Sequence, residues 1–516
     1  MTYCLIMFSQ IHVVLDLLLF CFHAKALVNH GDTQARILIL GAGASGLQAA
    51  RTLHDNGMDD FIIVEAADRI GGRVQSAQFA GYTVPLGAGW VQRAGSQTDQ
   101  LVHDLDLRRH TSDYDSLTIR NATGHDVTDE ADANYERLEK AIDKLNELSA
   151  RLKKNDDIPD MSQRSALRIG EWIPQSAIDK AIEWFEYDFE YADGPEVSST
   201  EAVGLDEGEE LYITDTGGFE RIFDEVAGFL TTPAYINHTR LNQKVVSIDY
   251  RNDISVVVTC EDGTRYIGEY VLITFSIGVL QNPNLIQFIP TLPEWKDVEI
   301  KKFQMAAYTS IYLSFPSKFW DDTEWVLYAS ERKGYFPAFL NYQAAGLFPN
   351  GTPVIVVFVI GDESRRVEAQ PSDATKAEIQ QVLRDMYGDS IPEATDILVT
   401  RWSQNPLTEG SFSNVPVEVP TKCRQKLQSR VGRLFFGGEA TSDHFSGYIV
   451  GGLDSGDREA RKMLQCLEDF KECPTFEGDG LECEQAEADS ACSVPSINTA
   501  FLGLFCLFGI LCYRPI

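Results

Sequence analysis

RILILGAGASGLQAA, residues 36–50, places a glycine-rich turn between an apolar run and an alanine-rich stretch. Gly41 lets the chain turn tightly out of a strand, and Gly43 allows the backbone to approach a pyrophosphate. Gly46 lets the next helix pack closely against the sheet. The stretch therefore predicts a strand, a phosphate-binding turn and a helix whose N-terminus faces the phosphates of a dinucleotide.

The residues that follow strengthen this prediction. A second apolar run ends in Glu65, 19 residues after Gly46, where a carboxylate can accept hydrogen bonds from both hydroxyls of an adenosine ribose. The next segment, ADRIGGR at 67–73, adds a glycine turn and brings two cations, Arg69 and Arg73, toward the same phosphates. Strand, glycines, helix, second strand and terminal acid thus occur in the order of a nucleotide-binding fold.

The motifs that continue along the chain are VPLGAGWVQ (84–92), YDFEYADGP (187–195), AYTSIYLSFPSKFW (307–320), ESRRVEAQ (363–370), ATDILVTRW (394–402), GSFSNVP (410–416) and FFGGEATSDHFSGYIVGGLDSG (435–456). Together with the N-terminal fingerprint, they make the chain resemble the flavin-containing amine oxidases, and within that family the plant-type polyamine oxidases. The resemblance covers about Arg36 to about Leu467. It implies an α/β fold, in which a Rossmann-like FAD-binding domain is interleaved with an α+β substrate-binding domain, and FAD as the cofactor.

By this resemblance the two domains alternate along the chain. The expected parts are a signal peptide (1–26), three parts of the FAD-binding domain (34–92, 212–290 and 400–467), two parts of the substrate domain (93–211 and 291–399), an acidic stalk (468–495) and a C-terminal hydrophobic anchor signal (496–516). Hydrophobic periodicity adds the local elements. It predicts helices over 130–153 and 373–388, and strands over 244–250, 254–260, 266–274, 307–315 and 353–360.

The resemblance also carries cofactor-binding positions onto this chain. Glu439 is expected beside the ribityl and pyrophosphate part of FAD, and a helix beginning near Gly451 is expected to face the flavin and stabilise negative charge on the reduced ring. The full set of expected FAD-binding residues is Gly41, Gly43, Ala44, Ser45, Gly46, Glu65, Ala66, Arg69, Gly72, Arg73, Gly87, Ala88, Gly89, Trp90, Val246, Trp402, Gly438, Glu439, Tyr448 and Ile449.

The substrate pocket is expected in front of the flavin. Members of the family hold the amine between two aromatic side chains, and the matching positions are Phe412 and Tyr448. Aromatic faces exclude water and attract positive charge on the rest of the substrate. Glu190 matches an acidic position on the substrate path, and the candidate walls of the pocket are Trp90, Tyr191 and Tyr308.

Two positions depart from the family pattern, and both belong to the candidate catalytic set. Ser310 stands where a lysine usually holds a water near flavin N5, and Lys301 and Lys302 lie too far upstream on the expected strand to replace it. Gln92 stands where plant-type members commonly have a glutamate that binds a substrate nitrogen. An amide in place of an acid removes one attraction for a cationic amine.

The function that follows from the resemblance is FAD-dependent polyamine oxidation. Spermine or spermidine would lose a hydride from the carbon next to a secondary amine, and O2 would be reduced to H2O2. Two alternatives stay open. One is an oxidase of another amine or of an L-amino acid, and the other is a catalytically weak, flavin-binding surface protein, which Ser310 and Gln92 would favour.

Composition limits the partners. The formal net charge of −33 repels nucleic acid, and it can either steer polycations into a cleft or only keep a secreted protein soluble. No cysteine or histidine spacing predicts a metal site. The partners expected are a polyamine and O2, with membrane attachment through a C-terminal glycolipid anchor.

Both ends of the chain resemble processing signals. Residues 3–22 are mostly apolar and precede Ala24-Lys25-Ala26, which predicts a signal peptide, with an uncleaved anchor as the alternative. Ala500 to Tyr513 forms a short apolar tail, which predicts a glycolipid-anchor signal and is short for a membrane span. The location expected is secreted or cell surface, with glycosylation at Asn121, Asn237 and Asn350, and with disulfides of undetermined pairing among Cys466, Cys473, Cys483 and Cys492.

Overall fold

In the computed structural model, β1 (Thr33–Leu40) lies inside a sheet that gathers strands from three distant parts of the chain. The structure describes residues 32–92, 95–155, 158–203, 209–348, 350–417, 419, 424–468 and 473. The order is β13-β10-β11-β12-β1-β2-β9, and β21 also pairs with β12. The bounds are β2 (Phe61–Val64), β9 (Thr239–Arg240), β10 (Val245–Asp249), β11 (Val256–Cys260), β12 (Arg265–Ile273), β13 (Gln287–Ile289) and β21 (Leu434–Phe436).

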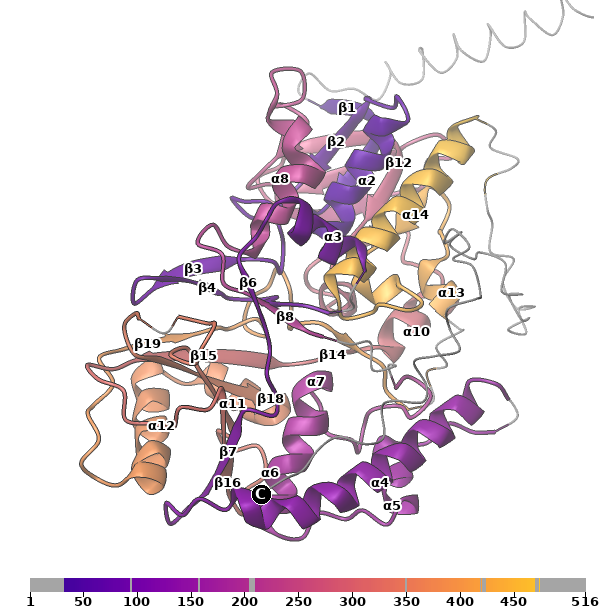
Figure 1. Ribbon diagram of the computed structural model, residues 1–516. Coiled ribbons are helices and arrows are strands. Elements are labelled where there is room, and N and C mark those ends of the chain that lie inside the picture. The colour runs from indigo at the N-terminus through magenta and orange to yellow at the C-terminus, as the bar shows by residue number, and fades with distance from the viewer. Residues whose placement is uncertain are drawn as a thin grey trace, which may run out of the picture. The chain divides into compact units, whose positions relative to one another are not determined.

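Both faces of this sheet are covered where the strands are apolar, which is the second half of β1 and the whole of β2. Ile37 and Ile39 on β1 pack with residues of α2 (Ala44–Asp55) and α14 (Ile449–Glu468). Leu38 and Leu40 point to the other face and pack with β10, β11 and β12, as the two-residue repeat of a strand requires. Figure 1 shows indigo α2 beside yellow α14, with α3 (Gln97–Asp104) and α8 (Ile222–Ala227) near them.

A second sheet, of order β19-β15-β18-β17-β16-β7, builds the other half of the described chain. The bounds are β7 (Leu117–Asn121), β15 (Tyr308–Ser314), β16 (Trp325–Ala329), β17 (Ala338–Asn341), β18 (Val354–Ile360) and β19 (Asp396–Val399). Tyr312 and Phe358 belong to the core on the side of α4 (Thr128–Leu152) and α6 (Ala177–Glu183). Ile311 and Val357 belong to the core beside α12 (Ser372–Tyr387).

Smaller elements complete the fold. They are the strands β3 (Ser76–Phe79), β4 (Tyr82–Pro85), β5 (Trp90–Val91), β6 (Arg109–Thr111), β8 (Leu211–Ile213), β14 (Gln304–Met305) and β20 (Ser413–Asn414), and the helices α5 (Gln163–Ile169), α7 (Phe189–Tyr191), α9 (Ile277–Gln281), α10 (Glu294–Lys302), α11 (Gly361–Ala369) and α13 (Arg424–Gln428). Strand β5 pairs with β8, and β14 pairs with β20. Both pairings join segments that the sequence separates widely.

The local elements predicted from periodicity are confirmed by α4, α12, β10, β11, β12, β15 and β18. The placement of Lys301 and Lys302 on a strand was wrong, because they end α10. There Lys301 pairs with Asp297 and Lys302 with Glu299, at helical spacings. The predicted signal peptide, the stalk and the anchor signal lie outside the described residues, apart from Glu468 and Cys473 within the stalk range.

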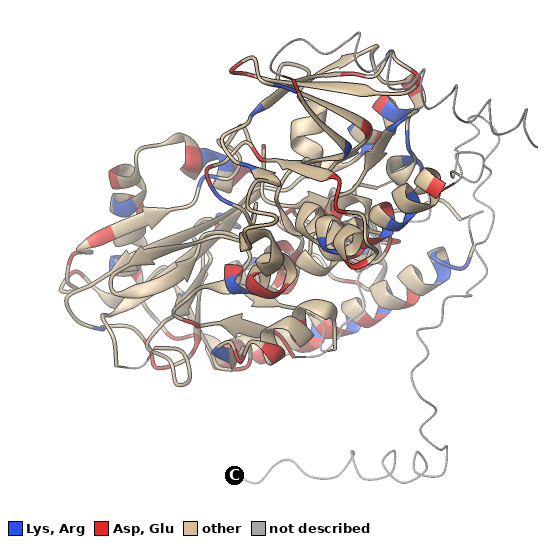
Figure 2. Cartoon of the chain, turned by 90° about the horizontal axis from the view of Figure 1, so that it is seen from above, with Lys and Arg blue, Asp and Glu red and all other residues tan. Residues whose placement is uncertain are grey.

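Residues of both charge signs lie along the helices (Figure 2). On α4, for example, Lys144 pairs with Glu147 at 2.7 Å. In the described part of the chain, none of the helices combines the length and hydrophobicity that crossing a bilayer requires.

Candidate FAD and amine site

The turn after β1 has the geometry that its glycines predict. Gly41 has φ +111°, a conformation that favours glycine, and its N–H donates to the carbonyl of Val64 at 2.9 Å. A Cβ on Gly46 would lie 1.9 Å from the carbonyl oxygen of Gly41. Only glycine at position 46 therefore lets α2 begin this close to the end of β1.

The N-terminus of α2 is prepared for an anion. Gly43 is the N-cap, no side chain caps the helix, and its first turn has no acid. The N–H groups that begin a helix lack partners within it, so they attract a phosphate. Gly72 faces this turn, since a Cβ on it would lie 3.2 Å from the Cα of Gly43. The two glycines thus let the backbones of the two turns approach each other closely at the N-terminus of α2, where the pyrophosphate is expected.

Glu65 lies at the end of β2, as predicted. Its Oε2 accepts from the N–H of Ala42 and its Oε1 from the N–H of Ala67, both at 2.7 Å. Each carboxylate oxygen keeps a second lone pair, so ribose hydroxyls can still bind. The segment that leads to half-buried Val246 passes here, because the N–H of Gln243 donates to the Glu65 carbonyl at 2.8 Å. Ala66 lies between the two bonded groups.

The two predicted cations have different partners. Arg69 donates to the carbonyls of Ile70 and Gly72 and to the side chain of Gln75. Arg69 thus braces the glycine turn, a role that the predicted phosphate contact did not include. Arg73 donates to the carbonyl of Ser411 at 3.1 Å and forms an ion pair with Glu439 at 2.9 Å.

The loop Gly87-Ala88-Gly89 has almost no room for side chains. A Cβ on Gly87 would lie 1.9 Å from the Arg73 carbonyl oxygen and 3.1 Å from the Trp402 ring. The indole N–H of Trp402 donates to the Leu86 carbonyl at 2.7 Å, and the Ala88 N–H donates to the Arg73 carbonyl at 3.2 Å. Trp90 follows directly, so the loop joins the FAD-binding motifs to the aromatic pocket.

Glu439 ties together three parts of this site. It pairs with Arg73, accepts from the Ser413 hydroxyl at 2.5 Å, and accepts from the Gly447 N–H at 2.7 Å. Burial by itself would raise the pKa of Glu439, but the charge of Arg73 and these hydrogen bonds outweigh burial and hold the pKa below its ordinary value. Glu439 is therefore an ionised, buried group, and it fixes the backbone at Gly447, the residue before Tyr448.

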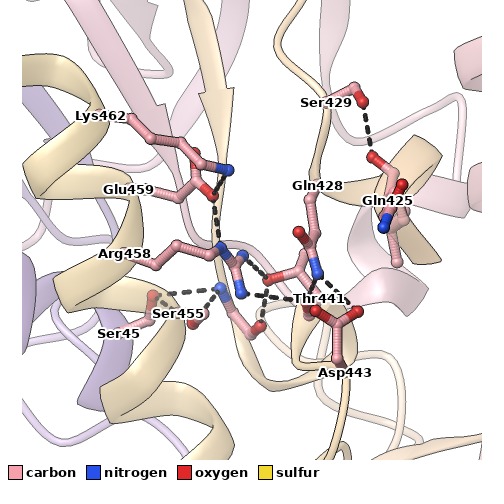
Figure 3. Close-up of polar contacts among 12 residues, drawn as sticks. Ser45, Gln425, Gln428, Ser429, Thr441, Asp443, Ser455, Arg458, Glu459 and Lys462 are labelled. Atoms are coloured by element: carbon pink, nitrogen blue, oxygen red, sulfur yellow. Dashed lines mark hydrogen bonds and ion pairs between the residues drawn. The ribbon is translucent and has the colours of Figure 1, made fainter. Parts of the chain in front are cut away.

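The segment around Glu439, residues 438–441, is held against α2, α14 and α13 (Figure 3). The N–H of Gly438 donates to the hydroxyls of Ser45 and Ser455, which lie 3.0 Å apart. Arg458 donates to the Thr441 hydroxyl at 2.9 Å, and Gln428 donates to the Thr441 carbonyl at 2.9 Å. Helix α14 begins at Ile449, two residues before the predicted start near Gly451.

FAD fits the residues that the structure brings together. An uncapped helix N-terminus faces a turn without side chains, a carboxylate ends β2, and a glycine loop leads to the aromatic pocket. Gly41 to Gly46 and Gly72 would hold the pyrophosphate, Glu65 the ribose, and the loop 87–89 with Trp402 the flavin side. All of these groups come from two of the predicted FAD-binding parts, 34–92 and 400–467.

The pocket residues Phe412, Tyr448 and Glu190 also come together. The Tyr448 hydroxyl donates to Glu190 at 2.5 Å. Phe412 packs beside Gly447, the residue before Tyr448, because a Cβ on Gly447 would lie 3.5 Å from the Phe412 ring. The rings of Phe412 and Tyr308 lie 6.1 Å apart, which places Tyr308 on the predicted wall. An aromatic box with one carboxylate is the result.

Burial sets the protonation of this box. It raises the pKa of Glu190, although the Tyr448 hydrogen bond opposes the shift. Burial also raises the pKa of Tyr448, followed by the effect of the Glu190 charge, and Glu210 contributes in the same direction. The charges that act on Tyr448 are thus carboxylates, which suits a cationic ligand.

Sequence analysis missed two residues of the pocket. Glu210 accepts a hydrogen bond from the Tyr114 hydroxyl and lies within electrostatic reach of Tyr308 and Tyr448. Phe189 packs against the rings of Trp90 and Tyr308, and against those of Trp184, Phe185, Trp325 and Phe358. Glu210 follows an acidic run that matches no motif, so no local signal distinguished it.

Ser310 and Gln92, the two positions that depart from the family pattern, lie in different parts of the structure. Ser310 is buried on β15, where its N–H donates to the Thr400 hydroxyl at 2.9 Å. It lies between Tyr308 and Tyr312 on the strand face that packs toward the pocket. Gln92 is half-buried just after β5, and its carbonyl accepts from Ser96 at 3.4 Å. A direct contact of Gln92 with substrate stays a prediction.

Across the described ranges, no cluster of three or more His, Cys, Asp or Glu could hold a metal ion.

Comparison with known proteins agrees with this geometry. The sequence profile of the flavin-containing amine oxidoreductases matches residues 44–464. The chain is 38% identical to polyamine oxidase 6 of Oryza sativa subsp. japonica over 464 residues, covering 85% of this chain and 92% of the relative. It is 37% identical to polyamine oxidase 1 of Zea mays over 482 residues, covering 86% and 94%.

Solved structures show the same fold. Putrescine oxidase bound to putrescine superposes with a TM-score of 0.67 at 18% sequence identity, covering 84% of this chain and 99% of that one. The predicted α/β fold, with the architecture of the amine oxidases, is thereby confirmed.

Proposed function

The chain belongs to the flavin-containing amine oxidoreductases, and we propose that it is a polyamine oxidase acting on spermine or spermidine. It is an FAD-dependent amine oxidase. The observation that carries the polyamine assignment is the half-buried Tyr448–Glu190 pair inside an aromatic box. A long, multiply charged amine has both apolar methylenes for the rings and nitrogens for the carboxylates.

The groups around the box favour a cation over a carboxylate-bearing substrate. Glu190 and Glu210 act together on Tyr448, and an L-amino acid would meet repulsion there. When bound, FAD supplies the acceptor for a hydride from the carbon next to nitrogen and passes the electrons to O2, giving H2O2. Phe412 and Tyr308 exclude water from the reacting carbon, while Glu190 attracts a nitrogen of the same substrate.

The test is anaerobic mixing of the purified protein with spermine or spermidine, followed by O2, while flavin absorbance is recorded. Bleaching that recovers in O2 is the expected result. Flavin that stays oxidised with both amines contradicts the proposal, and bleaching by other amines alone would redirect it to their class. Identification of the products would show which carbon–nitrogen bond is broken.

Tyr448→Phe should shift the acid limb of kcat/KM to higher pH. The hydroxyl now donates to Glu190 and opposes the rise in its pKa caused by burial. Without this bond the pKa of Glu190 rises further, so the carboxylate that attracts the amine forms only at higher pH. One charge-assisted hydrogen bond corresponds to a shift of about one pH unit. Tyr335→Phe, which removes a hydroxyl from Glu378 at another site, is the control and should leave the limb in place. A limb that stays fixed in Tyr448→Phe would refute the pairing.

Ser310→Lys should speed reoxidation of the reduced flavin by O2 roughly tenfold. The position faces the pocket side of β15, and a cation there would stabilise negative charge that develops on oxygen. Stopped-flow absorbance measures the rate directly. Ser310→Met matches the length of lysine without its charge and should give no gain. Equal rates in the Lys and Met variants would show that charge at position 310 is not limiting.

We also propose that the chain enters the secretory pathway and is held at the cell surface by a glycolipid. The support is the apolar stretch at each end of the sequence, the Cys466–Cys473 disulfide, and exposed positions for Asn237 and Asn350. Half-buried Asn121 is the third predicted glycosylation site. Release of the protein from cells by a phosphatidylinositol-specific phospholipase, and a loss of mass after glycosidase treatment, are expected. Cytosolic, unglycosylated protein would contradict the proposal.

A further inference from the structure

The helix that carries Glu190 contains an irregular turn. Helix α6 continues through a π-helical turn, Trp184–Asp188, into α7, and Figure 1 shows α6 and α7 following one another. The Phe189 N–H donates to the Trp184 carbonyl, five residues back. Such a turn holds one residue more than an α-helical turn and turns every later side chain by about 100°. The π-turn thus decides where Phe189 and Glu190 point.

One ammonium group spans this turn. Lys333, from the segment between β16 and β17, donates to Glu183 at 2.5 Å and to Asp188 at 2.9 Å. These carboxylates are five residues apart, and in a regular α-helix they would point about 140° away from each other. The π-turn brings them to the same side. Lys333 therefore contacts the residue just before the turn and the last residue within it.

Other groups hold the first end of the turn rigidly. Arg164 makes a two-pronged ion pair with Glu183 at 2.8 and 2.6 Å, and the Trp172 indole N–H donates to Glu183 at 2.8 Å. Glu183 is fully buried. Burial would raise its pKa, but the hydrogen bonds from Arg164 and the charge of Lys333 outweigh burial and keep the pKa low. Asp188 depends on Lys333 alone for its ion pair among the described contacts, and burial raises its pKa to about 7.

The far end of the turn leads directly into the pocket. Phe189 follows Asp188 and packs on Trp90 and Tyr308. Glu190 comes next and meets the Tyr448 hydroxyl. A change in the turn would move these two pocket groups while leaving Phe412 and the FAD-binding motifs in place.

We propose that Lys333 is a positioning residue for the amine pocket, which bridges Glu183 and Asp188 across the π-turn and thereby aims Glu190 at Tyr448. This inference rests on the proposed function and adds a residue outside the pocket that sets its affinity for the amine. Lys333 acts through Glu190 and touches no reacting atom. Because Lys333 affects the binding of the charged nitrogen, its loss should raise KM and leave kcat nearly unchanged.

The test compares Lys333→Met with Lys180→Met. Lys180 lies on α6 and pairs with Glu331 at 2.8 Å, so its loss removes a cation that joins the same two segments without spanning the turn. We expect Lys333→Met to raise KM for spermine about tenfold with kcat within about twofold, and Lys180→Met to change neither by more than about twofold. Hydrogen–deuterium exchange of residues 184–191 should rise only in Lys333→Met.

A double-mutant cycle separates positioning from stability. In a Glu190→Gln background, Lys333→Met should raise KM by less than about twofold, because its action passes through the carboxylate. An equal rise in both backgrounds, or unchanged exchange over 184–191, would overturn the proposal. If Lys333→Met does not fold, Asp188→Asn removes one arm of the bridge and should still raise KM about threefold; an unchanged KM overturns the proposal. If no polyamine reduces the flavin of the wild-type protein, the proposed function fails instead. The exchange measurement would still test whether Lys333 stabilises the π-turn.

Discussion

Gly46→Ala should yield protein without bound FAD and with a free energy of unfolding lowered by about 3 kcal/mol. The added Cβ would lie 1.9 Å from the Gly41 carbonyl oxygen and 3.2 Å from Ile39 Cγ2. Both neighbours are fixed, one as backbone and the other as buried core, so α2 must move away from β1. That movement opens the turn that receives the pyrophosphate. Flavin absorbance of the purified protein and chemical denaturation measure the two effects.

Gly228→Ala is the matched control for this change. Gly228 also belongs to a helical segment of the same half of the fold, but nothing lies within 4 Å of a Cβ added there. We expect its free energy of unfolding to stay within about 0.5 kcal/mol of the wild type, with full flavin content. A Gly46→Ala protein that retains FAD would show that the turn can widen without losing its ligand.

Glu439→Ala should lower the free energy of unfolding by about 3–5 kcal/mol and weaken FAD affinity roughly 100-fold. The change leaves Arg73, the Ser413 hydroxyl and the Gly447 N–H without their shared acceptor. Asp55→Ala removes the acid of an exposed ion pair with Arg51 in the same half of the fold, and should cost less than about 1 kcal/mol. Denaturation of each variant and titration with FAD provide the comparison.

The pH dependence of this effect has a definite sign. The pKa of Glu439 is lower in the folded protein than its ordinary value of about 4.3, so its ionised form stabilises the fold at neutral pH. That stabilisation is lost as the pH falls from the ordinary pKa through the folded one. The stability gap between wild type and Glu439→Gln should therefore narrow below about pH 4. A gap that widens in acid would mean that Glu439 is protonated in the native protein.

Local patterns were enough to predict the geometry of the glycine turns and the place of Glu65, while the binding of FAD by these residues stays a prediction. The turn from Gly41 to Gly46, the acid at Glu65 and the glycine pair near Gly72 are each defined by neighbours in sequence, because strand, turn and helix follow one another directly. The same holds for the strands and helices predicted from periodicity. The prediction that Lys301 and Lys302 lie on a strand was wrong, because two adjacent lysines show no hydrophobic periodicity that distinguishes a strand from a helix.

The pocket could be predicted only in part, because its geometry depends on contacts between distant segments. Phe412, Tyr448 and Glu190 were found through motif resemblance, and the structure brings them together. Glu210 reaches the pocket through the pairing of β8 with β5 and β6. Phe189 reaches it through the π-turn. The hydrogen bond that stabilises this turn comes from Lys333, which lies far along the chain. The sequence around residues 184–188 therefore does not contain the residue that stabilises the turn.

The interleaving of the first sheet also governs when it can form. Strand β1 ends at Leu40, but β21, which completes its neighbour β12, begins at Leu434, and α14 follows still later. At about 5–20 residues per second, the ribosome needs roughly 20–80 s to make the intervening 400 or so residues. During that time the apolar faces of β1 and α2 lack their final cover. A chain that ends before α14 would therefore lack the helix that covers α2, and its first sheet should not reach a stable fold.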